Sequence, residues 1–232
     1  MAYVIPAPAV PSLPVVGSDD EFPVHRIYCV GRNYADHARE MGHDPDREEP
    51  FFFMKSPDCL VPGAKGRSVD FPYPSKTSDV HHEMELVVAL KSGGDNIAED
   101  QALDCVFGYA AGLDMTRRDL QGEMKKAGRP WEIGKSFENS APCSAINPAS
   151  AIGHPANARI HLEVNSEVRQ DGNINQLIWN VAESISYLST LFTLAPGDLI
   201  FTGTPAGVGP VVRGDKLHGV VDGVGEIDIA VV

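Results

Sequence analysis

The segment from His81 to Leu90 constrains the fold of this chain more than any other. It reads His-His-Glu-Met-Glu-Leu-Val-Val-Ala-Leu, which predicts a strand with two carboxylates near its start. Side chains alternate between the two faces of a strand, so Glu83 and Glu85 are predicted to point the same way. The apolar run that follows indicates that the strand enters the interior. There, a carboxylate is costly unless it is paired or bound to a cation.

A third carboxylate, Asp114, ends the apolar stretch 107–113, which is itself a predicted buried strand. Three carboxylates from two strands suit a hard, oxygen-preferring ion such as Mg²⁺ or Mn²⁺. The competing interpretation is an ordinary solvated strand face, where a Glu-x-Glu pair is common and binds no metal. The uninterrupted apolar run favours the metal site, and both interpretations remain open on these residues alone.

Composition limits the classes of partner. The 232 residues fit one large domain, and their apolar fraction of 43% is enough for a hydrophobic core. The net charge of −13 argues against nucleic acid and against anionic membrane surfaces. It also means that a small anionic substrate needs a local positive site. No apolar run reaches the ~20 residues that would span a bilayer.

The cysteines and the start of the chain bear on its compartment. Cys29, Cys59, Cys105 and Cys143 are widely spaced and form no Cys-x-x-Cys motif, which favours a reduced, cytoplasmic location. The first residues lack a basic region and are broken by prolines, so no secretory signal is expected.

The pattern of short strands and few helices predicts an α+β or mostly-β domain, because βαβ alternation is absent. Residues 1–24 are Pro-rich and are predicted to form an extended arm before a domain at 25–232. Asn165-Ser166 is predicted to form the turn of a hairpin. Helices are expected at 34–41, 99–105, 116–126 with Thr116 as its cap, and 176–194; further strands are expected at 26–30, 51–55, 159–164, 167–170, 199–201, 217–221 and 225–232.

Two residues of the helix at 116–126 are candidates for substrate binding. Arg118 and Gln121 lie three positions apart and therefore share a face, close after Asp114. An arginine suits a carboxylate through its planar fork of donors, and an amide suits a carbonyl. The alternative is a solvated helix face, which is the preferred interpretation for Arg117, Lys125 and Lys126.

Three further residues are candidates for catalysis. His37 and Glu40 lie three apart on a short predicted helix between glycines, where a His supported by a carboxylate would activate water under a lid. From spacing alone, a surface His–Glu pair is the commoner explanation. Lys135 has apolar neighbours that predict a partly buried ammonium able to stabilise an oxyanion, although a surface lysine would give the same pattern.

Taken together, these segments resemble the fumarylacetoacetate hydrolase family. The matching stretches occur in family order and cover nearly the whole chain from residue 25: Cys29–Tyr34, His82–Glu85, Gly112–Gln121, Gly134–Phe137 and Gly197–Pro205. The short single-domain chain is similar to the acylpyruvase branch. Its stretch from Phe22 to Lys55 is most similar to the bacterial members that cleave fumarylpyruvate.

The resemblance implies a mixed β-roll or β-sandwich fold and a homodimer. It implies that Glu83, Glu85 and Asp114 ligate Mg²⁺ or Mn²⁺, and that His37 and Glu40 form the water-activating pair on a lid. The substrate pocket would contain Lys135 together with Arg32, Asn33, Arg118, Gln121 and Thr204.

The implied activity is metal-dependent hydrolysis of the C–C bond of a 3-acylpyruvate. The expected reaction converts 3-fumarylpyruvate into fumarate and pyruvate, as in gentisate-type aromatic catabolism. Alternatives are a general acylpyruvase, an oxaloacetate decarboxylase, an isomerase of an unsaturated 2-oxo diacid, and a metal-dependent binding protein without catalysis. The full set of His37, Glu40 and Lys135 argues against the binding protein.

Overall fold

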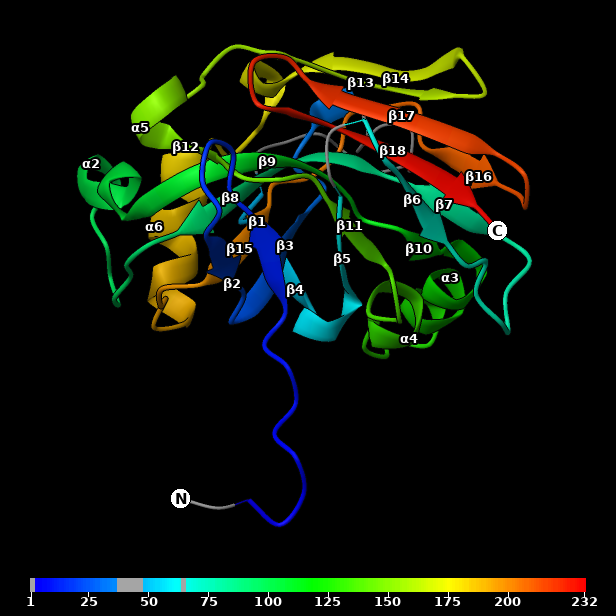
Figure 1. Ribbon diagram of the computed structural model, residues 1–232, viewed down its shortest axis with the longest axis horizontal. Coiled ribbons are helices and arrows are strands. Elements are labelled where there is room, and N and C mark those ends of the chain that lie inside the picture. The colour runs from blue at the N-terminus through cyan, green and yellow to red at the C-terminus, as the bar shows by residue number, and fades with distance from the viewer. Residues whose placement is uncertain (1–2, 37–47, 64–65) are drawn as a thin grey trace.

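The computed structural model describes residues 3–36, 48–63 and 66–232 as two stacked β layers with helices at their ends (Figure 1). The strands are β1 Ser12–Pro14, β2 Glu21–Pro23, β3 Arg26–Gly31, β4 Phe51–Lys55, β5 Leu60–Pro62, β6 Ser68–Phe71, β7 Val80–His82, β8 Met84–Leu90, β9 Val106–Leu113, β10 Thr116–Arg117, β11 Ala141–Cys143, β12 Asn147–Pro148, β13 Arg159–Val164, β14 Glu167–Asn173, β15 Asp198–Phe201, β16 Gly209–Val211, β17 Lys216–Val221 and β18 Gly225–Val231. The α-helices are α2 Glu99–Ala102, α3 Arg118–Lys126, α4 Glu132–Lys135, α5 Ala149–Ile152 and α6 Val181–Leu191, and short 3-10 turns span Pro57–Cys59, Leu103–Cys105 and Ile174–Gln176.

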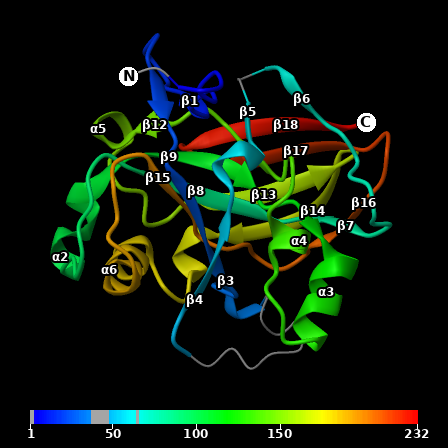
Figure 2. The ribbon, with the colours of Figure 1, turned by 90° about the horizontal axis from the view of Figure 1, so that it is seen from below.

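The larger sheet has the order β4-β3-β15-β8-β9-β11-β5, and β12 also pairs with β9. The second layer has the order β14-β13-β17-β18-β6 and lies across the first (Figure 1). A small sheet, β10-β7-β16, connects them at one edge. Figure 2 shows α3 and α4 on one side of strands β3 and β4, and α6 on the other.

Strand β8 explains why its sequence is apolar without interruption. Met84, Leu86 and Val88 pack into the main core between the two layers, while Val87 and Ala89 pack into a second core on the opposite face. Because both faces are buried, the strand has no solvated side. The predicted segment 81–90 is in fact two strands, since β7 pairs with β10 and β16 whereas β8 pairs with β9 and β15. Glu83 lies at the break between them.

Two helix predictions are wrong at their ends. The helix expected from Thr116 begins at Arg118, and the hydroxyl of Thr116 donates to the Asp114 carbonyl instead of capping the helix. The helix expected at 176–194 spans only Val181–Leu191, because the side chain of Asn180 caps it by accepting from the amide of Glu183. The hairpin at Asn165-Ser166 is confirmed, with both turn residues at positive φ.

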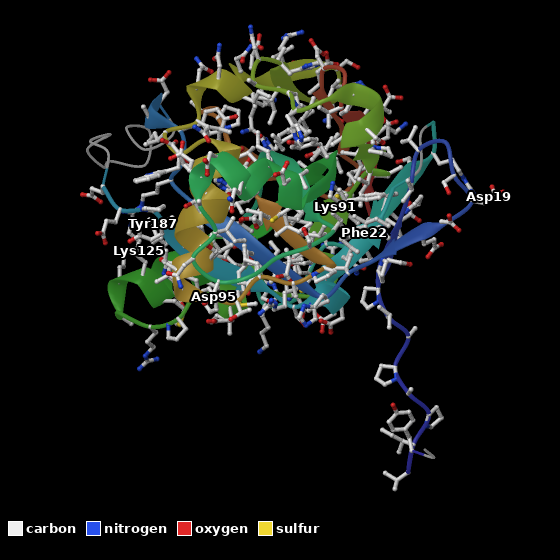
Figure 3. All side chains as sticks on the ribbon, turned by 90° about the vertical axis from the view of Figure 1, so that its left-hand side faces the viewer. Asp19, Phe22, Lys91, Asp95, Lys125 and Tyr187 are labelled. Carbon is white, nitrogen blue, oxygen red and sulfur yellow. The ribbon has the colours of Figure 1, made fainter. Side chains whose placement is uncertain are left out.

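The predicted N-terminal arm is extended only in part. The beginning of the segment projects away from the body (Figures 1 and 3), but the carbonyl of Pro11 accepts from the amide of Val24, and β1 and β2 pair with each other. Leu13 and Phe22 of these strands are buried in the second core, so this part of the segment belongs to the domain. No helix among the described residues is long and apolar enough to cross a membrane.

Candidate metal and substrate site

The three predicted acidic residues meet at the end of the large sheet. Glu83, Glu85 and Asp114 are buried, and each offers a carboxylate oxygen within 4.8 Å of the others. The pairing of β8 with β9 places Glu85 opposite Gly112, and the amide of Asp114 donates to the carbonyl of Glu83 over 2.9 Å. The carboxylates therefore converge because adjacent strands end together.

Lys135, at the end of α4, bridges two of these carboxylates. Its Nζ atom donates to Glu83 Oε2 at 2.8 Å, to Asp114 Oδ2 at 2.7 Å and to the hydroxyl of Thr116 at 2.8 Å. Burial lowers the pKa of Lys135, but the charges of Asp114 and Glu83 outweigh this effect and leave the pKa raised. The residue is only 2% exposed, so its ammonium is more deeply buried than its sequence context predicts.

Arg118 and Gln121 share a face of α3, as their spacing predicts. Arg118 donates to Glu83 Oε1 through Nη2, and to Gln121 Oε1 through Nη1 at 2.6 Å. Because the amide oxygen of Gln121 is occupied by this bond, its NH₂ group is the part available to a ligand. The pair therefore presents donors to the pocket.

The buried carboxylate of Glu85 is the strongest indication of a cation site. Burial, followed by the charges of Asp114 and Glu83, raises the pKa of Glu85 well above its usual range. Its Oε2 atom accepts from the amide of Gly203 at 2.7 Å, and no Lys or Arg among the described residues forms an ion pair with it. Three buried carboxylates at this spacing are an oxygen donor set that fits Mg²⁺ or Mn²⁺.

The sequence interpretation missed a second lysine. The Nζ atom of Lys55 lies 2.8 Å from Asp114 Oδ1 and 3.1 Å from the hydroxyl of Ser140, and it also bonds the carbonyl of Lys135. A signal was present in the sequence. Phe51, Phe53 and Lys55 occupy alternate positions of β4 and so share one face, on which a lysine after two aromatic residues stands out.

A cavity opens over the carboxylates. Its aromatic wall is formed by Phe51, Phe53 and Trp131, with Phe51 and Trp131 in edge-to-face contact at 5.4 Å. Its polar lining contains the three carboxylates of Glu83, Glu85 and Asp114 and the neutral side chains of Gln121 and Thr204. It also contains the cations Arg32, Arg118, Lys125 and Lys135. The cavity therefore offers carboxylates that suit a metal cation and cationic side chains that suit an anionic ligand next to it.

The remaining predicted site residues differ in their placement. Arg32 lines the cavity, with its guanidinium 5.2 Å from the Phe51 ring. Asn33 is buried, and its side chain bonds the backbone of Trp179 and Thr202. Thr204 lines the cavity, but its hydroxyl donates to the carbonyl of Met84. Asn33 and Thr204 thus hold the loops around the site together.

The predicted pair His37 and Glu40 lies outside the described residues. A residue that the sequence interpretation did not single out, Gln170, braces the strand break: its Oε1 atom accepts from the amide of Met84 at 3.0 Å, and its Nε2 atom donates to Thr204 at 2.7 Å. No motif marks this glutamine, because its partners come from distant strands.

Known proteins resemble this chain along most of its length. The family profile described as fumarylacetoacetate (FAA) hydrolase C-terminal matches residues 26–232. A crystal structure of fumarylpyruvate hydrolase from Pseudomonas aeruginosa, in complex with Mn²⁺ and pyruvate, superposes with a TM-score of 0.98 at 56% identity, over 100% of this chain and 99% of that one. This likeness confirms the mixed α+β fold.

Curated relatives carry two different names. A fumarylpyruvate hydrolase of Ralstonia sp. is 50% identical over 193 residues, which are 82% of this chain and 98% of the relative. The mitochondrial oxaloacetate tautomerase of Mus musculus is 46% identical over 198 residues, 85% of this chain and 87% of the relative.

Proposed function

This chain belongs to the fumarylacetoacetate hydrolase family, and from that premise we propose that it is a metal-dependent hydrolase of the C–C bond of 3-acylpyruvates. The proposed substrate is 3-fumarylpyruvate, cleaved to fumarate and pyruvate in gentisate-type aromatic catabolism. One observation carries the proposal: Glu83, Glu85 and Asp114 are buried together at the base of a cavity whose other polar walls are cationic. The Mn²⁺ and pyruvate bound by the Pseudomonas aeruginosa relative support it.

The residues of the site suit a divalent cation and an anionic substrate together. Glu83, Glu85 and Asp114 would hold Mg²⁺ or Mn²⁺, which supplies a Lewis acid for the 2-oxo acid end of the substrate. The formal charges of these carboxylates are matched by Lys55, Lys135 and Arg118. A divalent cation therefore leaves the site net positive, which favours an anion despite the net charge of −13.

The side chains around the carboxylates have separable roles. The NH₂ group of Gln121, oriented by Arg118, would donate to a substrate oxygen. Lys135 would stabilise the oxyanion that forms at the distal carbonyl, and an oxyanion would replace one of its three present acceptors. We also assign Arg32, Asn33 and Thr204 to substrate binding, which is supported for Arg32 and Thr204 by their place in the cavity wall.

His37 and Glu40 are the proposed water-activating pair. His37, supported by Glu40, would take a proton from water, and the hydroxide would add to the distal carbonyl carbon. Collapse of the adduct breaks the adjacent C–C bond. The electron pair goes to the 2-oxo acid fragment as an enolate, whose protonation gives pyruvate, and the acyl fragment leaves as a carboxylate.

Tautomerisation of oxaloacetate is a second candidate, because relatives at 42–46% identity carry that name. It requires enolate stabilisation but no activated water, so the same cavity suits it. Decarboxylation of oxaloacetate would use the same enolate. The candidates are separated by their products with each substrate.

Lys135→Met tests the proposal. Binding of Mn²⁺, measured by calorimetry, is expected to stay intact or tighten, because the variant removes a cation from two carboxylates that would ligate the metal. Hydrolysis of fumarylpyruvate is expected to fall by about a hundredfold or more. Lys91→Met, an exposed lysine at the end of β8, is the matched control. Full activity of Lys135→Met would overturn the oxyanion role.

We also propose a cytoplasmic homodimer. All four cysteines are buried free thiols, which suits a reducing compartment. The arm exposes Tyr3, Val4 and Ile5 far from the body, which suits contact with a second subunit. Light scattering of the full chain and of a chain lacking residues 1–10 tests the dimer.

A further inference from the structure

Besides Lys135, which contacts the carboxylates, three further cations line the cavity. Arg118 and Lys125 lie on α3 and Arg32 follows β3, and all three are wall residues of the same cavity. Arg118, Gln121 and Lys125 are spaced so that they share one face of the helix. At 1.5 Å per residue, Lys125 lies about 10 Å further along the axis than Arg118.

The three cations do not have equivalent surroundings. Arg118 is held at the metal end by Glu83 and Gln121. Arg32 stacks over Phe51, and Lys125, labelled at the left of Figure 3, is exposed in the last turn of α3. Burial, and then the like charges of Arg32 and Arg118, lower the pKa of Lys125, so these groups are close enough to repel one another. Both Arg32 and Lys125 would attract an anion that binds between them.

The spacing identifies that anion. The carbon chain of a fumarylpyruvate places its two carboxylates about 7 Å apart when extended. With the 2-oxo acid end at the carboxylate cluster, the distal end would extend along the wall of the cavity, to which Arg32 and Lys125 both contribute. A monoanionic acylpyruvate such as acetylpyruvate has no group to meet these cations.

We propose that Lys125, with Arg32, forms the subsite for the distal carboxylate of a dianionic 2-oxo acid, and that Lys125 determines the preference for such substrates over monoanionic ones. The inference rests on the proposed function, since it fixes the 2-oxo acid end at Glu83, Glu85 and Asp114. The neighbouring Lys126 lies about 100° around the helix and does not line the cavity, which makes it the matched control.

The test uses two uncleavable ligands of equal length, 2-oxopimelate and 2-oxoheptanoate, of which only the first carries a distal carboxylate. Calorimetry with the Mn²⁺-loaded wild type is expected to show that 2-oxopimelate binds at least about tenfold more tightly than 2-oxoheptanoate. Lys125→Met should lose most of this preference while its affinity for 2-oxoheptanoate stays within about twofold. Lys125→Arg should restore it, and Lys126→Met should retain it.

Kinetics give the second readout. For Lys125→Met, kcat/KM on fumarylpyruvate is expected to fall about tenfold to a hundredfold, mainly through KM, with little change on acetylpyruvate. Equal losses on both substrates, or an unchanged preference in calorimetry, would overturn the subsite. A wild type that binds 2-oxopimelate selectively but cleaves no acylpyruvate would overturn the proposed reaction and leave the subsite standing.

Discussion

The Nζ atom of Lys55 lies 2.8 Å from the Oδ1 atom of Asp114, and both side chains are fully buried. Lys135 contacts the other oxygen of the same carboxylate at 2.7 Å. Asp114 is therefore fixed from both sides by lysines of different elements, β4 and α4. This arrangement links the stability of the fold to the geometry of the proposed metal site.

Lys55→Met should destabilise the metal-free protein by about 3–5 kcal/mol, because it leaves the buried Asp114 without one of its cations. Urea unfolding measures the loss. Addition of Mn²⁺ should recover part of it, since a bound cation replaces the missing charge beside Asp114. Lys91→Met, as the exposed control, should change stability by less than about 0.5 kcal/mol. A Lys55→Met protein as stable as the wild type would contradict the role of the ion pair.

Glu85→Gln should remove most of the stabilisation that metal confers. A ligand present at a hundred times its dissociation constant stabilises the wild type by about 2.7 kcal/mol, and thermal unfolding with and without Mn²⁺ measures this difference. Without metal, the variant should be at least as stable as the wild type, because the amide ends the repulsion from Glu83 and Asp114. Exposed Glu99→Gln is the control. An unchanged response of Glu85→Gln to Mn²⁺ would exclude Glu85 as a ligand.

His37→Ala should separate the two candidate activities. Hydrolysis of fumarylpyruvate is expected to fall by about a hundredfold or more, because the base for water is lost. The rate of oxaloacetate enolisation, measured through the change in ultraviolet absorbance, should stay within a few fold of the wild-type rate. The control is His218→Ala, on strand β17 of the second layer. Equal loss of both activities would show that His37 does not act on water.

Asp119→Asn should weaken the anchoring of α3 in a pH-dependent way. Burial opposes ionisation of Asp119, but bonds from Thr77 and from the amides of Ser78 and Leu120 dominate and lower its pKa. The carboxylate therefore contributes stability above the unfolded pKa, which is lost as pH falls through the lower folded value. Urea unfolding should show a deficit of about 1 kcal/mol at pH 7 that shrinks below pH ~4. A deficit independent of pH would contradict the assignment.

The acidic residues of the site could be predicted from sequence because strand alternation and strand ends are local properties. The pattern of two apolar runs is sufficient to predict that Glu83, Glu85 and Asp114 lie together. Gln170 could not be found in this way, since its partners come from strands distant in sequence. The alternation of Phe51, Phe53 and Lys55 marks Lys55 itself, but not its contact with Asp114. The spacing along α3 predicts correctly that Arg118 and Gln121 share a face. For Lys125 the expected solvated face is only part of the answer, because this exposed residue also lines the cavity.

The ends of helices show the same limit. The apolar residues at helical spacing predict a helix from residue 176. Their pattern includes positions whose backbone amides instead form hydrogen bonds with a distant part of the chain. Ile178 and Trp179 donate their amides to Asn33, so the chain cannot form helix there and begins α6 only after Asn180. Thr116 likewise accepts from Lys135 instead of capping α3. Long-range polar contacts at the site override local propensity in both places.

The most direct test of the central claim is product analysis by NMR after fumarylpyruvate is mixed with the metal-free protein, with either Mn²⁺ or EDTA added. We expect fumarate and pyruvate to form in equal amounts with Mn²⁺ and to be absent with EDTA. Cleavage at the same rate in EDTA would contradict it. So would a protein that, with Mn²⁺, leaves fumarylpyruvate intact and acts only on oxaloacetate.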